Sequence, residues 1–240
     1  CSFIMMVCMS TFLLQSSKGM LLSIFVVMSF VMAFLSYQDK YSMGHIFYSF
    51  MSIGIGSMID VSVSFFIPVM WIAMYFYLQS MNLRTFISSL LGLICPYWFV
   101  AVYLIYTNDM TLAVEHFSQL AEFGKVANFS QVPVSALVSI CYITILSVVG
   151  IIHYLRNRVF DKTRTRMFYN TFILFDIFTI AFIILQPQHY ATMLIILIVT
   201  TSPLIAHFIA LTNTWITNIA FKVIVAASLA LTIINILQLI

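Results

Sequence analysis

Residues 168–185, FYNTFILFDIFTIAFIIL, decide the fold class of this chain. A helix that spans a membrane needs about 20 mostly apolar residues, within a range of roughly 17–25. This stretch meets the requirement and carries one ionisable side chain, Asp176. Similar runs fill the rest of the 240 residues, of which 63% are hydrophobic and 7% are charged. A soluble domain has about 25% charged residues, so the sequence predicts an all-α, polytopic transmembrane helix bundle.

Apolar segments of this kind recur along the whole sequence, and we expect about eight or nine spanning helices in a single transmembrane domain, 1–240. The candidates are residues 1–14, 19–36, 46–59, 61–78, 86–106, 134–155, 168–185, 190–212 and 219–239. The weakest is 46–59, which is short and contains Gly54 and Gly56. It either spans the membrane or dips into it as a hairpin with 61–78 around Asp60. The chain opens with Cys1 inside an apolar run, so we expect an N-terminal truncation.

Basic residues predict the orientation, because Lys and Arg concentrate in cytoplasmic loops. The loop 156–166 holds the densest group of them: Arg156, Arg158, Lys162, Arg164 and Arg166. We therefore expect this loop in the cytoplasm of a bacterium, with the chain in the inner (plasma) membrane. Alternation of the helices then places Lys40, Arg84 and Lys222 on the same side. It places Asp60 and the loop 107–133 on the external side.

The external loop supplies one set of candidate functional residues. Residues 110–123 have the spacing of an amphipathic helix, with Phe117 on its apolar face and Gly124 as a C-cap. Carboxylates and imidazoles at a membrane face can act as general bases, so Asp60, Glu115 and His116 are the candidate catalytic residues. A solvated loop surface is the alternative. Nothing in the spacing resembles a metal motif.

Asp176 is the second candidate, because an ionised side chain in the middle of a spanning helix costs at least about 2.5–3.5 kcal/mol and needs a partner inside the bundle. His207 is the expected partner, which would make the pair a proton relay or a cation site. The alternative is an Asp that holds helices together through Thr171, Thr179 or Asn170. His153 is read as an interfacial residue near a helix end.

Several function classes find no support in the sequence. There is no P-loop, GxSxG, HExxH or dinucleotide fingerprint, and the cofactor remains unknown. The cysteines lie in apolar runs and form no CxxC pair. No basic patch suits nucleic acid, so the expected partner is membrane lipid. The oligomeric state is left open.

A family resemblance covers most of the chain. It is carried by the segment 47–59 with its two glycines, by Phe65-Phe66-Ile67-Pro68, Trp71, Asn82-Leu83-Arg84, Leu91-Gly92 and Pro96-Tyr97, and by Ser202-Pro203-Leu204-Ile205-Ala206 downstream of the basic loop 156–166. These residues resemble an uncharacterised polytopic integral membrane protein family of Bacteroides-type bacteria. The resemblance implies further N-terminal helices and assigns no activity.

A fainter similarity is to the multi-helix membrane glycosyltransferases that use lipid-linked sugar donors. It rests on the Gly54-x-Gly56 hairpin, on the aromatic helix with Pro68 that follows, and on the external amphipathic helix. It implies an enzyme that acts on polyprenyl-phosphate-linked sugars at the external face. Two alternatives stay open. One is a transporter or flippase that uses Asp176, and the other is a non-catalytic membrane assembly partner.

Overall fold

The structure, a computed structural model, describes residues 2, 17–108, 111–121, 124, 126–129, 132–211 and 215–237. All regular structure in these ranges is helical. Seven helical stretches are long and apolar enough to cross a membrane: Ser17–Leu35, Val61–Leu78, Leu83–Thr107, Val134–Asn157, Thr163–Leu185, Pro187–Ala210 and Thr217–Ile234. The shorter apolar helix Met43–Ile59 adds to them. The predicted all-α polytopic bundle is thereby confirmed. The expected segment 1–14 lies outside the described residues apart from Ser2.

The surface of these helices suits lipid better than water. Large apolar side chains are widely exposed; Ile24, Trp98 and Phe99 show 61%, 67% and 71% of their surface. So many exposed large apolar side chains are unusual on a soluble monomer and indicate contact with a membrane or a partner. Together with the long apolar helices, it identifies a multi-pass membrane protein.

The chain divides into two compact units. Unit 1 consists of Cys1–Met20 and Val126–Ile240, and unit 2 of Leu21–Lys125. Each unit has its own helix packing and is described by itself.

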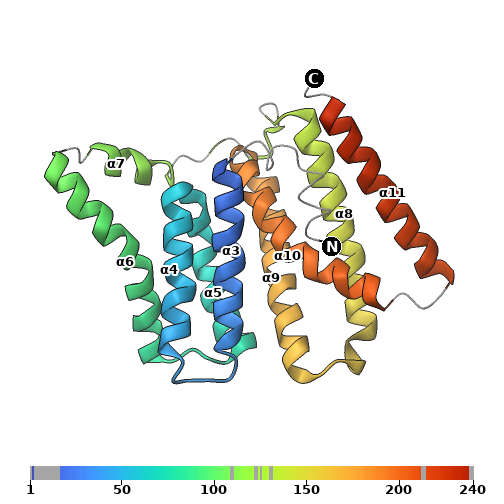
Figure 1. Ribbon diagram of the computed structural model, residues 1–240, viewed down its shortest axis with the longest axis horizontal. Helices are drawn as coiled ribbons and strands as arrows, with labels where there is room; N and C mark the ends of the chain where they lie inside the picture. The colour runs from blue at the N-terminus through green and yellow to red at the C-terminus, as the bar shows by residue number, and fades with distance from the viewer. Residues whose placement is uncertain are drawn as a thin grey trace. The chain divides into compact units, whose positions relative to one another are not determined.

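Unit 2 is built from helices that alternate in direction (Figure 1). Helix α3 (Ser17–Leu35) and helix α4 (Met43–Ile59) are followed by a segment of changing pitch. That segment comprises a 3-10 helix (Val61–Phe66), helix α5 (Ile67–Ala73) and a π-helix (Met74–Leu78). Pro68 stands in the first turn of α5, where its missing N–H is tolerated. The chain turns at Asp60, and this segment runs back along α4 (Figure 1). Whether α4 spans the membrane or dips into it stays a prediction.

Helix α6 (Leu83–Thr107) crosses α4 at very short range. A Cβ atom built on Gly54 would lie 2.9 Å from the Leu93 carbonyl oxygen, and one on Gly92 would collide with the Phe47 carbonyl oxygen. The Ser88 hydroxyl also donates to the Met43 carbonyl over 2.7 Å. Small residues permit this approach of two backbones. Gly54 therefore serves the α4–α6 contact, and α4 continues through it as a regular helix.

The turns of unit 2 lie alternately at its two ends, as predicted from the alternating direction of the helices. The Asn82 side chain donates to the Lys40 carbonyl over 2.7 Å, and the Gln38 amide donates to the Leu78 carbonyl over 2.8 Å. Both basic turns thus share one end. The end of α4 that Asp60 caps and helix α7 (Thr111–Ser118) lie at the opposite end (Figure 1). Which side of the membrane each end faces stays a prediction.

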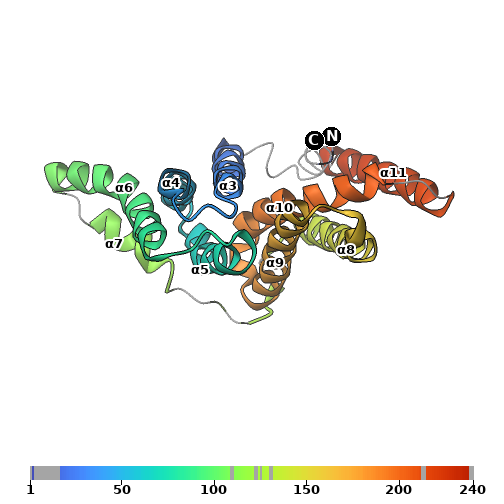
Figure 2. The same ribbon diagram turned by 90° about the horizontal axis from the view of Figure 1, so that it is seen from below.

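Unit 1 contains helices α8 (Val134–Asn157), α9 (Thr163–Leu185), α10 (Tyr190–Ala210) and α11 (Trp215–Leu237). Helix α10 packs against both α8 and α9 (Figure 2), and its side chains are buried almost all round. A Cβ atom on Gly150 of α8 would lie 3.0 Å from the Leu204 Cβ of α10, so these two helices also meet closely. Helix α11 is mostly exposed, and its polar contact with α8 is made by Tyr142, whose hydroxyl donates to the Ile224 carbonyl over 3.0 Å.

Candidate functional site

Helix α7 is shorter than the sequence indicated. The amphipathic pattern predicted a helix over 110–123 with Gly124 as its C-cap, but the helix ends at Ser118 and a turn follows. The Ser118 hydroxyl donates to the Glu115 carbonyl over 2.8 Å in the last turn. Gly124 therefore does not cap this helix.

His116 fastens α7 to the end of α4. Its Nε2 atom lies 2.9 Å from the Ser57 carbonyl oxygen, which can only accept, so Nε2 carries the proton. The Ser57 hydroxyl donates to the Gly54 carbonyl over 2.7 Å and accepts from the Tyr97 hydroxyl at 2.7 Å. Two polar groups, from α6 and α7, thus converge on one serine at the end of α4.

A cavity of about 400 Å³ lies beside this polar group. Its wall is formed by Met58 of α4, by Val100, Ala101 and Leu104 of α6, and by Leu112, Ala113 and Phe117 of α7, with Tyr97, Tyr103 and His116 as the residues that carry polar groups. We call it the α6–α7 pocket. Small-molecule sites usually have volumes of about 300–1,000 Å³ and mostly apolar walls with a few polar groups, and the pocket fits this description.

Only one of the three predicted catalytic residues lines the α6–α7 pocket. His116 does. Asp60 lies at the same end of unit 2 and accepts a hydrogen bond from the Ser62 amide over 2.9 Å, which caps the 3-10 helix. Glu115 is exposed on α7. Neighbouring residues on a helix point in different directions, so the presence of His116 in the pocket does not bring Glu115 with it. Among the residues that the structure describes, none with a carboxylate lines the pocket.

Asp176 occupies the core of unit 1 and is fully buried. Its Oδ2 atom accepts from Ser147 of α8 over 2.6 Å and from Thr201 of α10 over 3.1 Å. Its Oδ1 atom accepts from Thr200 of α10. We call Asp176 and these three hydroxyl residues the Asp176 layer. Each carboxylate oxygen has a donor, and the layer joins all three central helices of unit 1.

The partners that the sequence suggested for Asp176 are wrong. His207 bonds to Asp161 instead, as described below. Thr171 and Thr179 donate to carbonyls of their own helix, four residues earlier, at 3.0 Å and 2.7 Å. Asn170 faces Tyr154. The actual donors were missed because Ser147, Thr200 and Thr201 stand in apolar runs where hydroxyl residues are common, and nothing in one sequence fixes the rotation of one helix against another.

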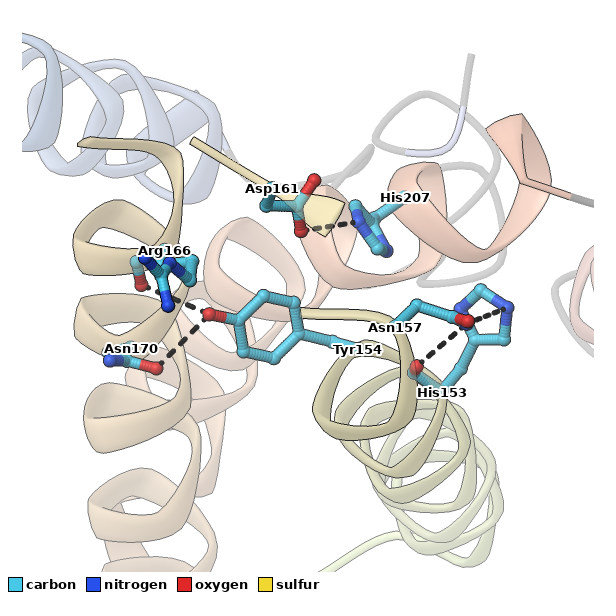
Figure 3. Close-up of polar contacts among 7 residues, drawn as sticks. All are labelled: His153, Tyr154, Asn157, Asp161, Arg166, Asn170 and His207. Carbon is cyan, nitrogen blue, oxygen red and sulfur yellow. Dashed lines mark hydrogen bonds and ion pairs between the residues drawn. The ribbon is translucent and has the colours of Figure 1, made fainter. Parts of the chain in front are cut away.

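A second polar group lies nearer the basic loop, on the same three helices (Figure 3). The His207 Nε2 atom lies 3.2 Å from the Asp161 Oδ2 atom. The Tyr154 hydroxyl donates to the Arg166 carbonyl over 3.1 Å and to the Asn170 Oδ1 atom over 3.3 Å. The Asn157 Nδ2 atom donates to the His153 carbonyl over 3.1 Å and to the His153 Nε2 atom over 3.0 Å. We call these residues, all drawn in Figure 3, the histidine layer.

The histidine layer is incompletely paired. Three of its buried nitrogen atoms have no hydrogen-bond partner among the described residues: His153 Nδ1, Arg166 Nε and His207 Nδ1. His207 itself is 8% exposed and lies against the rings of Tyr154 and Tyr169, with centroids 5.7 Å and 4.9 Å away. Native proteins leave few such atoms unpaired, and each calls for an explanation such as a bound water or ion.

The two layers are separated by an apolar contact. Residues 147 and 154 of α8, like residues 200 and 207 of α10, are seven positions apart, which corresponds to about 10 Å along a helix. Between them lie Gly150 and the fully buried Leu204, in the close contact described above. The described residues of the α8–α10 interface therefore form no continuous polar path between Asp176 and His207.

Comparisons with known proteins give no family. No family model, no curated protein and no solved structure matches the chain. Within the described ranges, no group of three or more His, Cys, Asp or Glu residues is placed to hold a metal ion.

Proposed function

We propose that the protein binds a lipid by its apolar chain in the α6–α7 pocket of unit 2. The observation that supports this most directly is the pocket itself, a cavity of about 400 Å³ with an apolar wall and one imidazole. The His116 ring has its Nε2 proton engaged by the Ser57 carbonyl. This leaves Nδ1 as the atom that can accept a hydrogen bond from a head group, or donate one when protonated.

The surroundings of the pocket favour a lipid as its occupant. On α6, the neighbouring side chains Val102, Ile105 and Tyr106 are exposed by 56%, 59% and 86% and suit contact with acyl chains. Lipid is the molecule present at highest concentration against such a surface. Helix α7 forms one side of the pocket. The hydrogen bond from His116 to the Ser57 carbonyl holds this helix in place when the apolar chain of a lipid enters.

A polyprenyl-phosphate-linked sugar at the external face of a bacterial inner membrane is the substrate class that a glycosyltransferase-like activity would require. His116 at the pocket and Asp60 at the same end of unit 2 support this activity. The described wall is apolar apart from Tyr97, Tyr103 and His116, which gives lipid binding more support than catalysis. The resemblance to Bacteroides-type membrane proteins is compatible with either.

A transporter or flippase that uses Asp176 is the second candidate, supported by a fully buried carboxylate in the core of unit 1. Its support is weaker, because hydroxyl donors already satisfy both carboxylate oxygens and the Gly150–Leu204 contact separates this group from the histidine layer.

The test compares two adjacent substitutions on α6. Ala101 lines the pocket, whereas its neighbour Val102 is exposed and does not. The purified full chain is reconstituted with a polyprenyl phosphate that carries a photoreactive group in its chain, and labelled peptides are mapped by mass spectrometry. We expect crosslinks to peptides of α6 and α7 in the wild type. Ala101→Trp fills the cavity and should abolish them, and Val102→Trp should leave them intact.

Outcomes of this comparison separate binding from catalysis. Equal labelling of both tryptophan variants would show that the probe marks lipid-facing surface rather than the pocket, and lipid binding there would be rejected. If Ala101→Trp alone loses labelling, sugar transfer from a polyprenyl donor is assayed next with His116→Gln. Retained transfer in that variant would remove His116 from the chemistry.

A further inference from the structure

The unpaired nitrogen atoms of His153 and His207 differ in chemical character, and their partners determine how. The Asn157 Nδ2 atom donates to a carbonyl as well as to the His153 Nε2 atom, which fixes it as the amide nitrogen. His153 Nε2 therefore accepts, and in the neutral ring the proton resides on Nδ1. His153 thus presents an unpaired N–H donor.

His207 has the opposite tautomer. Its Nε2 atom faces the carboxylate of Asp161 at 3.2 Å, and a carboxylate accepts. The proton therefore resides on Nε2, and the buried Nδ1 atom of the neutral ring is an unpaired acceptor. The helix α8–α10 interface thus contains one buried donor and one buried acceptor without partners, on two rings whose centroids are 5.8 Å apart.

We propose that a single hydroxyl oxygen, from water or from the alcohol group of a ligand, binds between His153 and His207. A hydroxyl oxygen accepts from the His153 Nδ1–H group and at the same time donates its own proton to the His207 Nδ1 atom. Two hydrogen bonds of about 2.7–3.0 Å through one oxygen join nitrogen atoms up to roughly 6 Å apart, and the two ring centroids are 5.8 Å apart. Figure 3 shows both rings at the same end of α8 and α10.

Other occupants fit this pair less well. A metal ion needs a lone pair from each ring, but the Nδ1 atom of His153 carries a proton as long as Asn157 donates to its Nε2 atom. A carboxylate or phosphate oxygen needs two donors, whereas His207 in its neutral form offers a lone pair. A hydroxyl group satisfies both nitrogen atoms without changing either proton. The oxygen would connect Asp161, His207, His153 and Asn157 in one chain of hydrogen bonds.

The first experiment reads the two tautomers. The full chain, labelled with ¹⁵N-histidine, is reconstituted at neutral pH in phosphatidylcholine vesicles, whose head group has no alcohol. Nitrogen shifts distinguish protonated from unprotonated ring atoms, and His153→Gln and His207→Gln assign the signals. We expect a proton on Nδ1 of His153 and on Nε2 of His207. The same tautomer in both rings would overturn the proposal.

The second measurement identifies the source of the oxygen. Magnetisation transfer to the His153 Nδ1–H group is recorded from water in phosphatidylcholine, and from lipid protons after phosphatidylglycerol, which carries alcohol groups, is added. Transfer from water in both membranes supports a bound water. Transfer that appears only with phosphatidylglycerol and starts on its protons supports a lipid alcohol. No transfer from either source overturns the proposal.

A double-variant cycle tests the shared oxygen independently. His153→Phe or His207→Phe leaves one buried nitrogen unpaired, while the double variant removes both. We expect the midpoint of thermal unfolding of the double variant to be no lower than that of the less stable single variant. The control cycle pairs His153→Phe with His189→Phe. His189 lies beyond the opposite end of α9, so the two changes in unfolding midpoint should add. Additivity in both cycles would overturn the proposal.

Discussion

The Asp176 layer and the histidine layer are built from the same three helices, yet they are paired to different degrees. Each of the three hydroxyl groups that face Asp176 donates to one of its two carboxylate oxygens. The histidine layer, nearer the basic loop, leaves three buried nitrogen atoms unpaired. A fully satisfied polar group in the bilayer holds helices together and has nothing left to offer a ligand, whereas an incompletely satisfied one can bind. From this difference we infer that the Asp176 layer stabilises the helix packing, whereas the histidine layer binds a ligand.

The largest effect is expected at the contact that separates the layers. In Gly150→Leu, the new side chain would meet Leu204, whose Cβ and carbonyl carbon lie 3.0 Å and 3.2 Å from the Cβ position. Overpacking of this kind costs about 1–3 kcal/mol of unfolding free energy, and we expect about 3. Gly44→Leu is the matched control, because nothing lies within 4 Å of its Cβ position. The measurement is unfolding by SDS titration, and equal midpoints would contradict the close contact.

Removal of the acceptor in the Asp176 layer should come next. Asp176→Ala removes three hydrogen bonds between helices, and such bonds are worth about 0.6 kcal/mol each in membrane proteins. We therefore expect a loss of about 2 kcal/mol of unfolding free energy in the same titration. Asp176→Asn keeps one acceptor oxygen and should lose less. A stable Asp176→Ala protein that has lost a transport activity would instead favour the transporter proposal.

A smaller effect separates hydroxyl groups that bond between helices from those that bond within one. Thr201→Val removes a bond to Asp176, and we expect a loss of about 0.6 kcal/mol. Thr171→Val removes a bond to the Met167 carbonyl of the same helix and should change the unfolding free energy by less than that. Both threonines are fully buried, so their burial is matched. A reversed order would show that the Asp176 layer does not hold α9 to α10.

The smallest effect on stability is expected at Asn157, which is part-buried at the end of α8. Asn157→Leu removes the donor that fixes the tautomer of His153. The unfolding free energy should change by less than about 0.5 kcal/mol, as for most surface substitutions. The ¹⁵N spectrum should nevertheless show a mixture of His153 tautomers. An unchanged spectrum would mean that another group selects the tautomer.

Hydrophobic runs predicted most of the fold. The expected segment 134–155 became helix α8 (Val134–Asn157), and the weak candidate 46–59 became α4 (Met43–Ile59), with bounds that differ by a few residues. This succeeds because a span in lipid must pair every backbone group internally, so a long apolar run has few structures available. The change from 3-10 helix to α-helix to π-helix within the segment Val61–Leu78 could not be predicted from the hydrophobic runs.

The candidate sites were predicted less well, because side-chain contacts depend on how helices rotate against each other. Asp176 was correctly singled out as a buried residue that needs partners, but its donors were not identifiable. His153 was read as an interfacial residue, and its unpaired Nδ1 atom could be found only from the structure. At α7, the apolar face predicted a helix over 110–123, but nothing in the spacing indicated that it ends at Ser118.

Pro203 stands between the two layers on α10, after Thr200 and Thr201 and before His207. Proline has no N–H group to donate to the carbonyl four residues earlier, so the helix is weakest there, and Figure 1 shows α10 changing direction along its length. The bend separates the part of α10 that donates to Asp176 from the part that bears His207. The angle of α10 at Pro203 therefore contributes to the spacing between the two histidine rings.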